Sequence, residues 1–110
     1  MCGIAGFCDY RDDFTDEAPF LGRLVRRMGD TLRHRGPDEN GIFLSRHAAF
    51  AHQRLCVIDP EGGKQPMTAY AGGYRYTIVY NGELYNGGEL RRELEAAGFL
   101  FETSCDTEVL

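Results

Sequence analysis

The chain has 110 residues, of which 43% are hydrophobic and 26% charged, a composition within the ordinary range of globular proteins. Its formal net charge of −5 and isoelectric point near 5.1 argue against nucleic acid or an anionic membrane surface as the main partner. No apolar run approaches the roughly 20 residues of a transmembrane helix, and the N-terminus lacks the basic leader of a signal peptide. We therefore expect a cytoplasmic protein.

The four cysteines are scattered along the chain without a C-x-x-C pair. This spacing argues against a structural zinc site and is typical of reduced thiols in a cytosolic protein. We expect no metal ligands and no disulfides among Cys2, Cys8, Cys56 and Cys105.

The first predicted element is a β-strand from Cys2 to Cys8, apolar on both faces and interrupted by Gly3 and Gly6. An amphipathic helix is predicted to begin near Pro19 and to end before Gly36. Its apolar residues recur at spacings of three and four: Leu21, Leu24, Val25, Met28 and Leu32. Most of the arginines interleaved with this stripe are interpreted as a solvated face.

Four further strands are predicted, over residues 41–45, 48–52, 55–58 and 74–80, the last of them ending at the turn signal Asn81-Gly82. A second helix follows Asn86, which together with Glu89 resembles a capping box, and stops at Gly98. A strand over residues 99–102 and the first turn of a helix from Asp106 complete the pattern. This order predicts an α+β fold in layers, and because the chain ends inside an apolar turn we expect a truncated domain.

Cys2 carries the most informative chemistry. If Met1 is removed, one residue holds both a thiol and a free α-amine, which near neutral pH is partly unprotonated and can accept the thiol proton. A nucleophile and its own base are then adjacent, as in N-terminal nucleophile enzymes. The alternative is that a cysteine at this position merely belongs to a buried edge strand.

Four downstream residues add matching roles. Asn81 and Gly82 deliver an amide side chain and a backbone N–H at adjacent positions and could form an oxyanion hole, although a plain turn explains the pair as well. Arg54 heads an apolar segment, where it could clamp a carboxylate or pair with a structural acid. Asp106 could receive an ammonium or stabilise a helix N-terminus. Together these roles describe hydrolysis of the side-chain amide of a free amino acid, and glutamine fits them.

With these residues in place, the chain resembles a class II glutamine amidotransferase domain, most closely the form found in glutamine-hydrolysing asparagine synthetases. The resemblance rests on the blocks MCGIAGF, RHRGPDENG, HQRLCVID, GGKQPM, YNGELYN and DTEVL, which occur in this order along the whole chain. It implies an N-terminal nucleophile hydrolase fold, an αββα sandwich, of which this chain would be the N-terminal portion. The family domain is nearly twice as long.

The resemblance also implies roles for individual residues. Cys2 would attack the glutamine amide while its α-amine moves the proton, and Asn81 and Gly82 would stabilise the oxyanion. Arg54 would hold the substrate α-carboxylate, and Glu83 and Asp106 would lie near its α-ammonium. The backbone of four residues would line the pocket: Leu55, Cys56, Val57 and Ile58. Cys105 departs from the Gly or Ser expected before the acid.

The implied partners are glutamine, a C-terminal synthetase domain that uses ATP and magnesium to amidate aspartate, and, as one option, a second copy in a homodimer. No cofactor is expected within these 110 residues. Two alternatives stay open: an amidotransferase that feeds ammonia to another acceptor, and a non-catalytic interaction module with the same fold. His34 and His52 are the first alternative bases if the terminal amine is not used.

Overall fold

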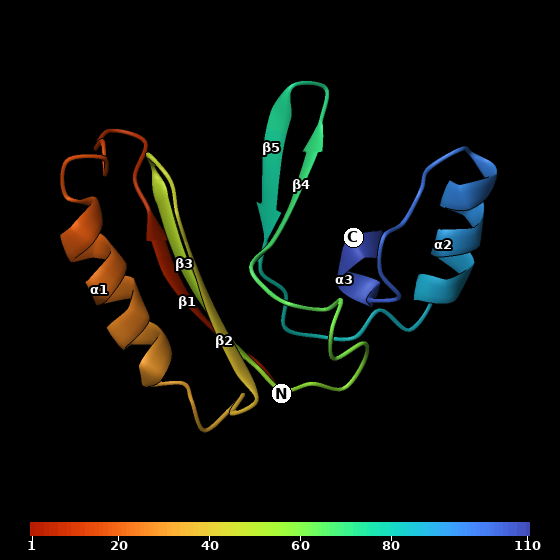
Figure 1. Cartoon of the computed structure of the whole chain (residues 1–110), viewed down its shortest axis with the longest axis horizontal. Helices are drawn as coiled ribbons and strands as arrows, with labels where there is room; N and C mark the ends of the chain where they lie inside the picture. Colours follow the sequence, from red (N-terminus) through yellow and green to blue (C-terminus); the bar gives the residue numbers. More distant parts are fainter.

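The computed structural model describes all of residues 1–110 and shows a mixed α/β domain with antiparallel sheets. Its elements lie in the order shown in Figure 1: β1 (Gly3–Cys8), α1 (Ala18–Asp30), β2 (Glu39–Leu44), β3 (Ala48–Arg54), β4 (Met67–Ala71), β5 (Tyr74–Ile78), α2 (Gly87–Ala96) and α3 (Asp106–Val109). None of the helices has the length and apolar character needed to cross a membrane.

Strand β3 is the centre of a three-stranded sheet, paired antiparallel to β1 on one side and to β2 on the other. Side chains alternate between the faces of a strand, so Ala49 and Ala51 face α1 while His52 and Arg54 face away from it. Helix α1 covers only the first of these faces. The opposite face carries the residues that matter for the site.

The core lies between α1 and the sheet. Val25, Ala49 and Ala51 are buried there, and three larger side chains pack against them: Phe7, Ile42 and Leu44. Gly29 brings the helix close, because a Cβ at this position would lie 2.8 Å from that of Ala51. Only 15 of the 110 residues are buried, and this apolar cluster lies in the half of the molecule formed by α1 and the three-stranded sheet.

Strands β4 and β5 form a separate hairpin, which the sequence prediction recognised only in part. The strand predicted over residues 74–80 is present as Tyr74–Ile78, but its partner β4 was missed. The two-residue connection Gly72-Gly73 has positive φ at both positions, 57° and 81°, as tight hairpin turns require. Asn81-Gly82 is therefore not the turn of a hairpin and lies in an irregular segment after β5, with a bend at Gly82.

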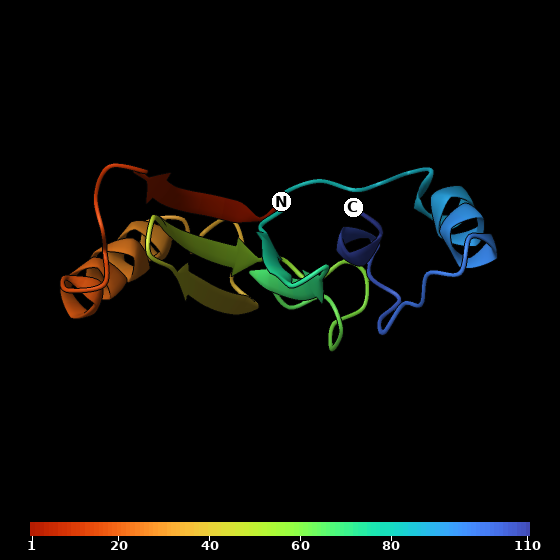
Figure 2. The same ribbon diagram turned by 90° about the horizontal axis from the view of Figure 1, so that it is seen from above.

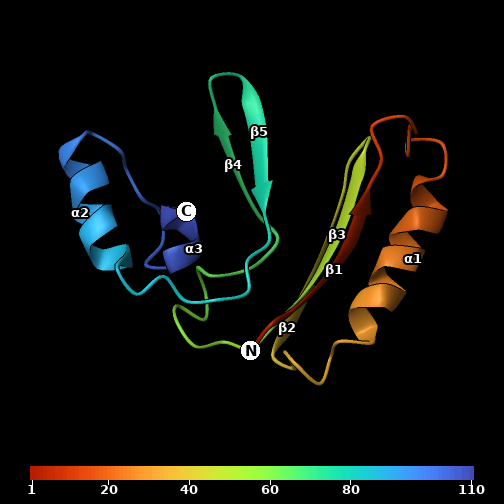
Figure 3. The same cartoon turned by 180° about the vertical axis from the view of Figure 1, so that it is seen from behind.

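Viewed from opposite sides, α1, the three-stranded sheet, the β4–β5 hairpin and α2 follow one another in that order (Figures 1 and 3). Figure 2 shows the same order from above, with the hairpin beyond the end of the sheet that carries the N-terminus. The hairpin does not pack broadly on the sheet. Three of its tyrosines, Tyr70, Tyr74 and Tyr76, are exposed.

Both helices predicted in the second half are present. Helix α2 begins after Asn86 and ends before Gly98, whose φ of 95° suits the C-terminal glycine. The predicted capping box is wrong, because the Asn86 side chain makes no cap hydrogen bond. Helix α3 begins at Asp106 as predicted.

Two predicted strands are wrong. Residues 99–102 find no partner strand, and the backbone N–H groups of Glu102 and Thr103 instead donate to the carboxylate of Glu108. Residues 55–58 are likewise irregular. In both segments side chains satisfy backbone groups that a ladder would otherwise pair.

Residues 58–60 are irregular because they wrap around the guanidinium of Arg54. Its terminal nitrogens donate to the carbonyl oxygens of Ile58, Asp59 and Pro60, at 3.1, 2.6 and 2.8 Å. They also bond the carboxylate of Glu39 at 2.6 Å, from the position directly opposite on β2. Gly63 completes the wrapping, since any side chain there would collide with the guanidinium. Arg54 is 4% exposed, so the charge is nearly enclosed.

Replacing Arg54 should therefore destabilise the fold strongly. Arg54→Ala removes one partner of an enclosed ion pair and leaves three carbonyl oxygens without a donor. We expect the unfolding free energy to fall by about 3 kcal/mol. This value is near the low end for buried ion pairs because Glu39 is partly exposed. Chemical denaturation of the full-length protein measures this loss.

Arg46→Ala is the matched control. The Arg46 Nε lies the same 2.6 Å from the Asp13 carboxylate, but its side chain is 70% exposed. Solvent screens such a pair, so little change in stability is expected. Equal losses in the two variants would show that enclosure does not set the strength of the Arg54 pair.

Candidate active site

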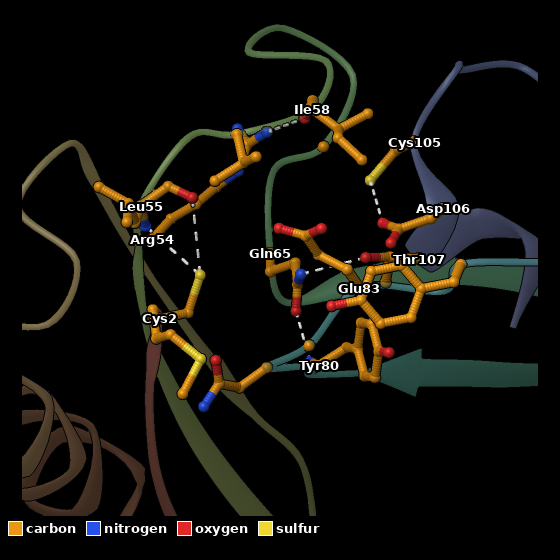
Figure 4. Close-up of a pocket in the computed structure, with 16 residues that line it drawn as sticks. Cys2, Arg54, Leu55, Ile58, Gln65, Tyr80, Glu83, Cys105, Asp106 and Thr107 are labelled. Carbon is orange, nitrogen blue, oxygen red and sulfur yellow. Dashed lines mark hydrogen bonds between the residues drawn. The ribbon is translucent and has the colours of Figure 1, made fainter. Parts of the chain in front are cut away.

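A cavity of about 370 Å³ opens where the start of β1, the end of β3, the segment after β5 and α3 come together (Figure 4). This volume is within the range of roughly 300 to 1,000 Å³ typical of small-molecule sites. Nine of the ten residues that the sequence singled out line it: Cys2, Arg54, Leu55, Val57, Ile58, Asn81, Gly82, Glu83 and Asp106. Residues up to 104 positions apart in the chain thus share one site.

Cys2 enters the cavity because it continues the alternation of β1. Ile4 lies opposite His52 on the face turned away from α1, and Cys2 is two residues earlier. Its Sγ accepts a hydrogen bond from the N–H of Leu55 at 3.3 Å and lies 3.7 Å from the Leu55 carbonyl oxygen. Arg35 fixes the main chain here, donating from Nε to the Cys2 carbonyl oxygen at 3.0 Å.

Met1 also lines the cavity, and its peptide bond makes the Cys2 nitrogen an amide. An amide nitrogen cannot take up a proton at neutral pH. Removal of Met1 would both clear its side chain from the cavity and create the free amine beside the thiol.

Arg54 lies at the cavity wall, but its terminal nitrogens are already bonded to Glu39 and to backbone carbonyls. The structure thus shows the pairing with a structural acid that the sequence left open. Binding of a substrate carboxylate by Arg54 remains a prediction.

Cys56 is the one predicted site residue that does not line the cavity. Its backbone N–H turns outward and donates to the Asp38 carboxylate at 2.8 Å. Partial burial raises the pKa of the Cys56 thiol, against the opposing effect of the Arg54 charge. Cys56 is accordingly a poor nucleophile near neutral pH.

The two acids lie across the cavity from Cys2 and Leu55 (Figure 4). Glu83 is exposed, and Asp106 accepts a hydrogen bond from the Leu84 N–H at 2.9 Å. The Asp106 carboxylate therefore holds the end of the Asn81–Leu84 segment against α3. It also presents negative charge to the cavity, as a site for an ammonium group would.

Neither alternative base lines the cavity. His34 is exposed, and His52 is buried behind the wall with its Nε2 near the carbonyl oxygen of Tyr80. No cluster of three or more His, Cys, Asp or Glu side chains is arranged to hold a metal ion. The cavity lining supplies a thiol, amide donors and carboxylates.

Sequence reasoning missed several lining residues: Gly63, Gln65, Tyr80, Tyr85, Cys105 and Thr107. Gln65 is the most consequential of them, because its side chain bonds both Tyr80 and Thr107. It lies in the block GGKQPM, which was noted for its resemblance but was given no role. No local pattern indicates its contacts, which join residues 15 and 42 positions away.

Comparison with known proteins agrees with this geometry. Asparagine synthetase [glutamine-hydrolyzing] 3 of Bacillus subtilis is 48% identical to the chain over 110 residues, and asparagine synthetase B [glutamine-hydrolyzing] of Escherichia coli is 36% identical over the same length. Asparagine synthetase [glutamine-hydrolyzing] of Brassica oleracea is 39% identical over 106 residues. These alignments cover 96% to 100% of this chain but only 17% to 19% of the relatives, so the chain spans less than a fifth of their length.

A family-level comparison covers the whole chain. The glutamine amidotransferase domain family matches residues 1–110 without a gap at either end. The cavity with its N-proximal thiol lies within this match, and the chain belongs to the glutamine amidotransferase domain family.

Proposed function

We propose that this chain is the glutamine-hydrolysing part of an asparagine synthetase. The observation that carries the proposal is the position of the Cys2 thiol in the cavity wall, with Asn81 and Gly82 in the same lining and the acids Glu83 and Asp106 across from it. A thiol nucleophile, amide donors and carboxylates are the groups needed to bind glutamine by its ammonium and to open its side-chain amide.

In the proposed reaction, the Cys2 sulfur forms a bond to the amide carbon of glutamine, and the free α-amine of Cys2 accepts the thiol proton. The oxygen of the tetrahedral intermediate takes up negative charge, which the Asn81 amide and the Gly82 N–H stabilise. The carbon–nitrogen bond then breaks, and the nitrogen leaves as ammonia with the proton returned by the α-amine. Water hydrolyses the resulting thioester, giving glutamate and the free thiol.

The rest of the proposal concerns the larger protein. We place this chain at the N-terminal part of a sandwich of two sheets between helices, followed by a synthetase domain that passes the ammonia to aspartate in a cytoplasmic enzyme. ATP and magnesium belong to that second domain, and no residue of this chain is assigned to them. The lengths of the relatives support this organisation.

Cys2 should be the thiol that reacts with a glutamine analogue. A diazoketone analogue of glutamine should alkylate Cys2 in the full-length protein after Met1 removal, because only this thiol combines cavity access with an adjacent amine. Peptide mapping by mass spectrometry gives the modified residue. Cys56, whose thiol pKa is raised by partial burial, is the internal control. Labelling mainly at Cys56 or Cys105 would contradict the assignment of Cys2 as the nucleophile.

Asn81→Ala should depress kcat for glutamine hydrolysis by about 100-fold, the usual effect of losing one oxyanion donor, with little change in KM. Steady-state glutamate release measures both constants. Asn86→Ala is the matched control: this side chain makes no cap hydrogen bond and does not line the cavity, so wild-type kinetics are expected. A rise in KM alone in Asn81→Ala would instead assign Asn81 to ground-state binding.

An uncleavable N-terminal extension should abolish glutamine hydrolysis and leave the fold intact, because the nitrogen of Cys2 then stays an amide. Synthesis of asparagine from added ammonia should survive, since that reaction bypasses this cavity. Mass spectrometry of the terminus accompanies both assays. Full glutamine-dependent activity with Met1 retained on every molecule would refute the terminal-amine mechanism.

A further inference from the structure

The backbone of Tyr80, which precedes the proposed oxyanion residues, is held by two side chains from elsewhere in the chain, the buried His52 and the half-buried Gln65. The N–H of Tyr80 donates to Oε1 of Gln65 at 2.6 Å, and its carbonyl oxygen lies 3.1 Å from Nε2 of His52. Two residues beyond Gly82, the N–H of Leu84 donates to Asp106 at 2.9 Å. Residues 81–83 lie between these anchored positions and are not themselves part of a β-strand.

We infer that His52 and Gln65 are positioning residues for glutamine hydrolysis, which fix the Tyr80 peptide so that Asn81 and Gly82 present their amide donors to the reacting carbon. The inference rests on the proposed function. It assigns to each side chain a specific hydrogen bond with Tyr80, and the role of Gln65, which also lines the cavity, is exerted through that bond.

His52 is suited to this role by its surroundings. The Tyr80 oxygen can only accept, so Nε2 carries the hydrogen. The other ring nitrogen, Nδ1, is buried without a partner. Burial lowers the pKa of His52, opposed by the bond to Tyr80 and aided by the Arg54 charge, which favours the neutral ring. A buried polar atom without a partner costs stability, and the only hydrogen bond that offsets this cost is the one to Tyr80.

Gln65 reaches Tyr80 because the sheet leaves room for it. Gly41 lies opposite His52 on β2, and a Cβ there would collide with the carbonyl oxygen of Gln65. The Gln65 amide nitrogen donates in turn to Oγ1 of Thr107 at 3.2 Å, and Thr107 is 3% exposed in α3. Gln65 therefore ties the Tyr80 peptide to the helix that carries Asp106.

Matched variants separate the hydrogen bond from the bulk of the side chain. In His52→Gln the amide nitrogen can occupy the place of Nε2, whereas the shorter His52→Asn places it near Nδ1, out of reach of Tyr80. Gln65→Glu keeps an oxygen for the Tyr80 N–H, and Gln65→Met keeps the volume but removes the acceptor. All four are made in the full-length protein after Met1 removal, with thermal unfolding as the folding check.

Two measurements are made on each variant. His52→Asn and Gln65→Met should lower kcat for glutamine hydrolysis by about 10- to 100-fold, the effect expected of a misplaced donor, with KM changed by no more than about threefold. His52→Gln and Gln65→Glu should recover most of kcat. Hydrogen exchange of the peptide containing Tyr80, followed by mass spectrometry, should be faster in His52→Asn and Gln65→Met than in the wild type. In His52→Gln and Gln65→Glu the exchange rate should return toward that of the wild type.

Asn81→Ala provides the final comparison. If His52 and Gln65 act through the oxyanion residues, combining either substitution with Asn81→Ala should lower kcat by much less than the product of the two single fold-losses. Fold-losses of kcat that multiply in the double variants would overturn the inference. So would wild-type kcat and wild-type hydrogen exchange at Tyr80 in folded His52→Asn and Gln65→Met. A wild-type protein that hydrolyses no glutamine would instead overturn the proposed function, and the exchange data would still decide whether the two side chains hold Tyr80.

Discussion

Near its end, strand β3 carries two buried polar side chains, His52 and Arg54, on the face turned away from α1. Their hydrogen bonds attach the cavity half of the molecule to the sheet. The Arg54 guanidinium gathers the carbonyls of residues 58–60, and the His52 ring meets the Tyr80 carbonyl. A polar group enclosed in protein needs a partner, so each side chain dictates where the backbone must go. The path of the chain beyond β3 follows from that requirement.

The two halves are held by different forces. Between α1 and the sheet, burial of Val25 and the alanines of β3 supplies the usual apolar stabilisation. Around the cavity, side chain–backbone hydrogen bonds connect the segments, as when Asp59 accepts from Ser104 across 45 residues. Hydrogen bonds are directional, so they fix geometry more closely than apolar contact does. That is the property a site for amide chemistry requires.

Patterns with a local cause were readable from the sequence. The spacing of Leu21 and Val25 predicted α1, and Gly98 marked the end of α2, because periodicity and C-terminal glycines act within a few residues. The nine cavity residues came from motif chemistry together with a family resemblance. The Gly72-Gly73 pair is an equally local turn signal, but the prediction did not use it and therefore missed strand β4.

The remaining features depend on long-range contacts. Leu55 to Ile58 has the composition of a strand, yet its path is set by a charge on Arg54 that no periodicity reveals. The same holds for the exclusion of Cys56 from the lining, which follows from a bond to Asp38, 18 residues earlier. Side-chain bonds to distant backbone leave no signature in a single sequence.

Gly41 has a consequence for how the chain can assemble. A strand that slips by one residue along its partner turns each side chain to the opposite face, and β2 could otherwise pair with β3 in several offsets. Only one offset brings a residue without a side chain under the Gln65 carbonyl. A slipped β2 would place Asn40 or Ile42 there and push the Gln65 segment off the sheet. Strand register and the architecture of the cavity are therefore selected together, and a misaligned sheet cannot carry an organised site.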